Sequence, residues 1–163
     1  MSTTTADLIE IDPTSLLVSV PASCTLDGVE TALAARGYTL GVKLESTSAA
    51  STIGDWLAAG ARGAPSMFSD PADHVVAGLH ATLPGGRTLE IRPGPRRAVG
   101  PDLTALALGT NHRLATVTHA WLRIHRLDAR RPSMVLPETD LDPPVNEGEA
   151  ALIDAIHTEL MRP

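Results

Sequence analysis

Short aliphatic runs bounded by prolines and glycines predict the strands of a sheet. Residues 16–20, Leu-Leu-Val-Ser-Val, lie between Pro13 and Pro21, which limit the run to a strand. Residues 74–83 and 87–91 alternate between apolar and polar positions and are joined by a Pro-Gly-Gly connection. This combination predicts a β-hairpin.

A longer alternating segment, residues 114–125, predicts a long strand with two different faces. One face carries the apolar residues Ala120, Leu122 and Ile124, and the other carries His119, Trp121, Arg123 and His125. His119 and His125 lie about 20 Å apart along such a strand, so they cannot share a metal ion unaided. His74 and His80 have the same spacing on the hairpin, and a cross-strand histidine pair forms if the registers agree. We interpret these histidines as surface or interface residues.

Apolar residues at helical spacing predict the helices. The first covers residues 26–36 and ends at Gly37, and the second covers 52–61 and starts from a Ser/Thr cap. Asp102 is expected to cap a third helix that ends at Gly109. A short extended piece is predicted for residues 38–44, and an amphipathic helix for 150–161. Together these elements predict an α+β fold, an antiparallel sheet with flanking helices.

The chain is expected to divide into an N-terminal segment (1–14), one α+β unit (15–127), a Pro-rich acidic arm (128–148) and a C-terminal helix (149–163). The arm contains four prolines and five acidic residues, which suits an extended linker or an arm laid over a surface. The terminal helix either folds back on its own domain or docks on a partner, and the sequence leaves both alternatives open.

Composition narrows the function classes. The 163 residues are 43% hydrophobic but include only four aromatic side chains, so stacking platforms for single-stranded nucleic acid are scarce. The single cysteine, Cys24, cannot close an internal disulfide, which favours a reducing cytoplasm. We interpret Cys24 as a small buried residue. No Cys/His spacing builds a metal site, no apolar run is long enough to span a membrane, and residues 1–11 do not resemble a signal peptide.

Charge is distributed unevenly along the chain. Residues 1–91 carry 4 basic and 10 acidic groups, residues 92–131 carry 8 and 2, and residues 132–163 carry 1 and 7. The basic middle either marks an anionic ligand site or balances charge within the fold. Binding of nucleic-acid phosphates by Arg92, Arg96 and Arg97 is disfavoured, because the whole chain is acidic, with a net charge of −6.

Several motifs, in order, resemble the second half of the flavin-binding domain of FAD-linked oxidases of the vanillyl-alcohol-oxidase and p-cresol-methylhydroxylase type. The alkyldihydroxyacetonephosphate synthase and glycolate-oxidase subgroup is the most similar. The resemblance covers Leu16 to Leu127, about two-thirds of the chain. The motifs are Leu17-Val18-Ser19-Val20, Gly37-Tyr38-Thr39-Leu40-Gly41, Ser51-Thr52-Ile53-Gly54-Asp55-Trp56, Leu83-Pro84-Gly85-Gly86-Arg87, Gly100-Pro101-Asp102-Leu103 and the run from Gly109 to Thr118.

The resemblance implies a flavin held in a cleft between two subdomains, the first of which holds the pyrophosphate on a glycine-rich loop. We expect that subdomain and the substrate-covering cap to be absent here. The half that remains is altered, because Asp55 stands where the family has the second glycine of Ser-Thr-Val-Gly-Gly-Trp. Arg62 replaces a small hydroxyl residue, and residues 111–118 lose the acid and both glycines of Glu-Gly-Thr-Leu-Gly-Val-Ile-Thr.

By resemblance, the residues expected to contact the flavin are Glu45, Ser46, Ser51, Thr52, Gly54, Leu114, Val117 and Thr118. The arginines available to meet its phosphates are Arg62, Arg92, Arg96, Arg97 and Arg113. No residue is assigned as a catalytic acid, base or nucleophile, so the chain is not expected to be catalytic alone.

Two hypotheses follow from this pattern. In the first, the chain is a subunit of a multi-chain oxidoreductase and completes an FAD site with a partner polypeptide. In the second, the half-domain has lost its cofactor and serves as a scaffold or assembly subunit. In both hypotheses, a protein partner or a second copy covers the face that the expected absence of the first subdomain leaves exposed.

Overall fold

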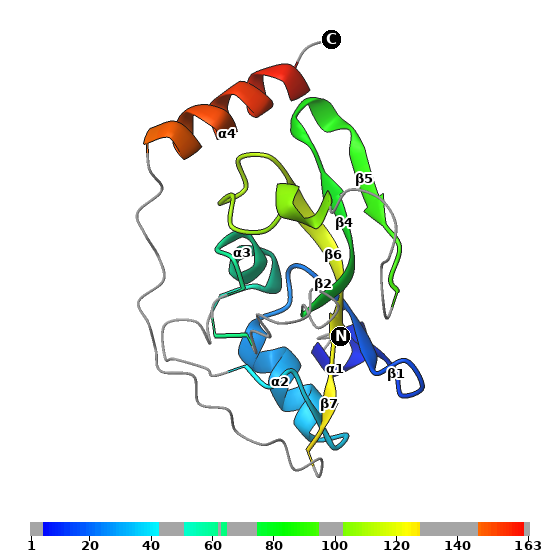
Figure 1. The fold of residues 1–163 in the computed structure, drawn as a ribbon. Coiled ribbons are helices and arrows are strands. Elements are labelled where there is room, and N and C mark those ends of the chain that lie inside the picture. The colour runs from blue at the N-terminus through cyan, green and yellow to red at the C-terminus, as the bar shows by residue number, and fades with distance from the viewer. Residues whose placement is uncertain are drawn as a thin grey trace.

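The centre of the molecule is a five-stranded antiparallel sheet (Figure 1). The computed structural model describes residues 5–42, 51–61, 63–64, 75–94, 103–127 and 147–161. The strands follow the spatial order β1-β2-β6-β4-β5. Their bounds are β1 (Glu10–Asp12), β2 (Leu17–Pro21), β4 (Val76–Thr82), β5 (Thr88–Ile91) and β6 (Thr116–Arg123). The predicted α+β class and antiparallel sheet are therefore confirmed.

The predicted hairpin is β4 and β5, joined by a short 3₁₀ turn, η2 (Pro84–Gly86). Gly85 and Gly86 have positive φ angles of 82° and 80°, a backbone conformation that L side chains rarely adopt. The Pro-Gly-Gly sequence therefore determines the shape of the turn. The hairpin places β4 against β6, where His80 pairs directly with His119, so a cross-strand histidine pair does form.

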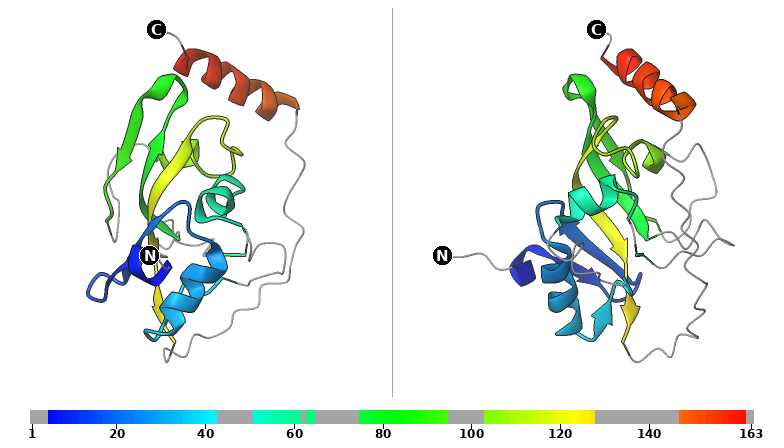
Figure 2. Two further views of the ribbon diagram at one scale, coloured as in Figure 1. Left: turned by 180° about the vertical axis from the view of Figure 1, so that it is seen from behind. Right: turned by 90° about the vertical axis from the view of Figure 1, so that its left-hand side faces the viewer.

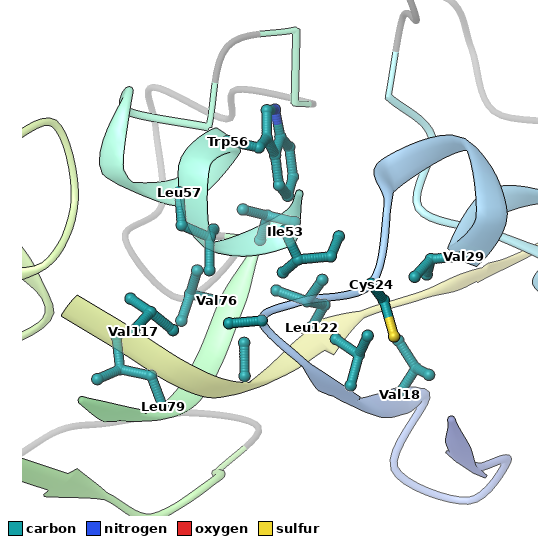
Figure 3. Close-up of a cluster of buried hydrophobic side chains, with 14 of the residues drawn as sticks. Val18, Cys24, Val29, Ile53, Trp56, Leu57, Val76, Leu79, Val117 and Leu122 are labelled. Carbon is teal, nitrogen blue, oxygen red and sulfur yellow. The ribbon is translucent and has the colours of Figure 1, made fainter. Parts of the chain in front are cut away.

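Helices α2 (Leu26–Ala34) and α3 (Ile53–Ala58) cover one face of this sheet (Figures 1 and 2). Figure 3 shows Ile53, Trp56 and Leu57 of α3 above Leu122 of β6. The predicted alternation along β6 is confirmed, since Ala120 and Leu122 are fully buried while Trp121 and His119 are only partly buried. With few aromatic residues available, aliphatic side chains fill this core.

Cys24 lies in that core between β2 and α2, with 5% of its surface exposed. Burial raises the pKa of its thiol, because a thiolate there would lose hydration. The structure thus agrees with Cys24 as a small buried residue rather than an activated nucleophile.

Four features differ from the sequence prediction or extend it. Before the predicted first strand, α1 (Thr5–Leu8) and β1 are formed, and β1 pairs with β2. The extended piece is reduced to β3 (Tyr38–Thr39), which pairs with β7 (His125–Arg126) in a small second sheet. The helix expected after Asp102 is only a 3₁₀ segment, η3 (Leu103–Leu106), and Asp102 itself is outside the described residues.

The C-terminal helix α4 (Glu147–Leu160) lies beside the tip of the hairpin (Figures 1 and 2). Arg87 Nη2 donates a hydrogen bond to the Leu160 carbonyl at 2.7 Å, and Arg113 forms an ion pair with Asp154. Of the two alternatives left open by the sequence, the structure shows the helix folded back on its own chain. Among the described residues, no helix is long and apolar enough to cross a membrane.

Replacing Leu122 by alanine tests the position of the core. Because Leu122 is fully buried under α3, we expect Leu122→Ala to lower the free energy of unfolding by about 2 to 5 kcal/mol. Leu127, which is 55% exposed, is the matched control, and Leu127→Ala should change stability by less than about 0.5 kcal/mol. Urea unfolding followed by circular dichroism measures both, and equal losses would contradict this core.

Candidate functional site

The predicted flavin-contacting residues that the structure describes lie in two segments. Residues 51–55 lead into α3, and residues 109–118 lead into β6. Glu45 and Ser46 are outside the described residues, as are three of the candidate phosphate-binding arginines, Arg62, Arg96 and Arg97.

The fold brings these two segments together through the turn that follows β2. The amide of Ala22 donates to the Thr118 carbonyl at 3.1 Å, and the Ala22 carbonyl accepts from the Gly54 amide at 2.9 Å. At the other end of α3, the Asn111 amide donates to the Ala58 carbonyl at 2.9 Å. Backbone hydrogen bonds therefore join two segments that are far apart in sequence.

The first amides of α3 are already used within the chain. The Ile53 amide donates to the Cys24 carbonyl at 2.8 Å, and the Gly54 amide donates to Ala22. The Asp55 amide donates to the Thr52 hydroxyl at 3.1 Å, so Thr52 is the N-cap of the helix. The groups that most often hold a phosphate at a helix start therefore already have partners here.

Gly54 packs closely against the turn that follows β2. A β-carbon at this position would lie 3.2 Å from the Ala22 β-carbon and 3.4 Å from the Ala22 carbonyl oxygen. Such contacts are tight, and both atoms belong to the turn that connects the sheet to α2. The glycine that matches the family motif is thus explained by helix–turn packing, without any ligand.

Asp55 links the two segments on their exposed side. Its Oδ2 accepts a hydrogen bond from the Thr52 hydroxyl at 2.7 Å, and its Oδ1 lies 3.1 Å from His112 Nε2. The Thr52 hydrogen bond, followed by that of His112, lowers the pKa of the Asp55 carboxyl. A carboxylate that is 63% exposed therefore stays charged at this surface.

His112 keeps a backbone conformation usual for glycine. Its φ is 63°, and that of Asn111 is 48°, both in the left-handed region. By resemblance, the family has a glycine at position 112. At this left-handed position the chain carries an imidazole that pairs with Asp55, an interaction that the sequence did not reveal.

Of the predicted residues in the second segment, Leu114 and Val117 point into the protein and Thr118 is exposed. Leu114 and Val117 are buried in the core, 3% and 4% exposed. The Thr118 hydroxyl donates to the His80 carbonyl at 3.2 Å, and Thr118 lies at a register shift between β4 and β6. Their match to the family motif therefore reflects folding of the strand as much as any contact with a ligand.

The described residues of these segments do not fit the diphosphate of FAD by themselves. The amides at the start of α3 are bonded internally, Asp55 adds a negative charge, and the Arg113 guanidinium is paired with Asp154. Each of these features disfavours an anion at this position. A flavin held here needs phosphate donors from elsewhere.

The titration of Asp55 tests the geometry of this surface. We expect its carboxyl to titrate below the ordinary aspartate range, and to move upward in both Thr52→Ala and His112→Ala, more strongly in the first. Since the folded pKa is lowered, the associated stability is present above the unfolded pKa and is lost as pH falls through the folded pKa. Carboxyl-carbon NMR shifts report the midpoints.

Asp12 is the internal control for this titration. Hydrogen bonds from Ser15 and Thr14 lower the pKa of its carboxyl, and it contacts neither Thr52 nor His112. Its midpoint should be the same in all variants. An Asp55 midpoint that does not respond to either substitution would show that the Thr52–Asp55–His112 contacts are absent in solution.

Comparisons with known proteins agree with the resemblance seen in the motifs. A family model described as an FAD binding domain matches residues 1–92. The uncharacterised FAD-linked oxidoreductase YgcU of Escherichia coli K12 is 29% identical over 119 residues, covering 73% of this chain and 24% of that protein. The uncharacterised FAD-linked oxidoreductase Rv2280 of Mycobacterium tuberculosis is 32% identical over 139 residues, covering 83% and 29%.

A solved structure of alkyldihydroxyacetonephosphate synthase has a similar fold, with a TM-score of 0.57 and 23% identity over 73% of this chain and 21% of that one. The chain thus spans about a quarter of the length of the curated relatives that it matches. The match of the family model to more than half of the residues confirms the resemblance seen in the motifs, and the chain belongs to the family of FAD binding domains that this model describes.

Proposed function

We propose that this chain is a non-autonomous subunit that forms one wall of a flavin site, while a partner chain holds the diphosphate of FAD. The observation that carries the proposal is that the first amides of α3 already donate hydrogen bonds within this chain. The family segments lie side by side on one surface, yet the amides of Ile53, Gly54 and Asp55 already have partners in this chain. Such a surface can line a flavin but needs a partner for the phosphates.

The chain matches only part of each curated relative. The curated relatives have about four times as much chain as the part that is matched here. In an assembly of this kind, another polypeptide would hold the phosphates. The electron or hydride transfer of such an assembly would belong to the flavin. This chain would position the flavin and exclude water on one side, and we assign it no acid, base or nucleophile.

A second candidate function is a cofactor-free scaffold or assembly subunit. The Asp55–His112 pair favours it, because this pair bridges the surface where the family approaches its cofactor with glycines. In this alternative, the same surface binds only protein. Cys24 is a free, buried cysteine, which is typical of a protein in a reducing compartment, so we propose a cytoplasmic location for either function.

A flavin measurement on two preparations distinguishes these functions. The chain alone, dialysed against FAD, should retain none, because the α3 amides and Arg113 already have partners within the chain. The complex purified from the native host through a tag on this chain should show the visible absorbance of bound FAD. Stoichiometric FAD on the isolated chain would contradict the need for a partner, and a colourless complex would favour the scaffold.

Asp55→Asn provides a size-matched control within the complex. Removing the charge should raise the FAD affinity by up to about fivefold, because like charges about 4 Å apart in water repel by about 1 kcal/mol. A decrease in affinity would show that the carboxylate itself contributes to binding.

A further inference from the structure

The C-terminal helix α4 is attached to the rest of the chain by two arginines. Arg113, in the loop before β6, forms an ion pair with Asp154 near the middle of the helix. Arg87, just after the hairpin turn, donates from Nη2 to the Leu160 carbonyl at 2.7 Å. That carbonyl belongs to the last turn of α4, so Arg87 caps the negative end of the helix dipole. The two attachment points lie about 9 Å apart along the helix.

Little apolar burial holds α4 in place. Of the described side chains in residues 151–161, none is buried, and Leu152 and Met161 are largely exposed. The side chains of Arg113 and Asp154 are 44% and 66% exposed. Exposed ion pairs are screened by salt and contribute little to stability. The helix can therefore leave at a much lower free-energy cost than α2 or α3, whose apolar side chains fill the core.

The surface under α4 is held together by hydrogen bonds that do not involve the helix. The loop that carries Arg113 is joined to α3, because the Asn111 amide donates to the Ala58 carbonyl at 2.9 Å. The hairpin turn that carries Arg87 is closed by the Leu83 amide, which donates to the Arg87 carbonyl at 2.8 Å. Release of the helix would therefore expose both guanidinium groups on an intact surface.

Arg113 adjoins the proposed flavin surface. Its neighbour in the sequence, His112, pairs with Asp55 of α3. Asp154 presents a carboxylate to Arg113, and guanidinium binds carboxylate and phosphate by the same charge-assisted hydrogen bonds. The helix therefore supplies, from within the chain, the kind of group that an anionic ligand would bring to this arginine.

We propose that α4 is an autoinhibitory latch, in which Asp154 occupies Arg113 and must leave before Arg113 can bind a phosphoryl group. The inference rests on the proposed function, since this phosphoryl group is the diphosphate of the FAD that the partner chain holds. In the released chain, the guanidinium of Arg113 adds a positive charge that offsets the carboxylate of Asp55. A ligand that binds only the released chain favours release, so assembly with the partner and release of α4 promote each other.

Inorganic pyrophosphate, titrated into the isolated full chain and followed by NMR, tests the latch without any flavin. We expect Asp154→Asn to raise the pyrophosphate affinity about three- to fivefold, because the ion pair then no longer competes for Arg113. Combining Asp154→Asn with Arg113→Gln should abolish this gain. Asp27→Asn, at an exposed position in the first turn of α2, is the matched control for the change in net charge and should leave the affinity unchanged.

Hydrogen exchange at the α4 amides shows whether the helix leaves. In the unsubstituted chain, pyrophosphate should speed exchange in α4 and leave the amides of α2 unchanged. Arg87→Gln, which removes the second attachment, should speed exchange in α4 with no ligand present. Equal pyrophosphate affinity with and without Asp154→Asn, or binding that leaves exchange in α4 unchanged, would overturn the latch. Because neither measurement involves flavin, a colourless native complex would contradict the proposed function without contradicting the latch.

Discussion

The rest of the structure depends on the two backbone hydrogen bonds of Ala22. Its amide bonds to Thr118 at the start of β6, and its carbonyl bonds to Gly54 in the first turn of α3. One residue thus joins the sheet to the helix that covers it. Because Gly54 has no β-carbon, α3 can approach this turn closely enough to place Trp56 and Leu57 in the core. The same contact removes the Gly54 amide from any external ligand.

This arrangement separates two surfaces with different chemistry. On the helix side, the segments that match FAD-linked oxidoreductases come together, but Asp55 and His112 bridge them. On the opposite face, β6 presents His119 and Trp121 against His80. Both faces depend on the alternation of side chains along β6, because Ala120 and Leu122 face the core while His119 and Trp121 face outward.

The sequence predicted those parts of the fold that local patterns determine. Alternation identified β6 and the hairpin strands β4 and β5, and the Pro-Gly-Gly sequence identified the turn between β4 and β5. These signals act within a few residues. β1 was missed because Glu-Ile-Asp has little strand character and forms by pairing with β2. The family resemblance placed candidate flavin contacts in both residues 51–54 and residues 114–118. The sequence could not predict the Asp55–His112 pair, because that contact joins residues 57 positions apart and depends on a left-handed backbone at His112.

Amide hydrogen exchange at Ile53, Gly54 and Asp55 tests the central claim most directly. If these amides are bonded to Cys24, Ala22 and Thr52, they exchange slowly in the isolated chain, and adding FAD leaves their rates unchanged. Fast exchange in the isolated chain that slows when FAD is added would contradict the account, because these amides would then be free to hold a phosphate.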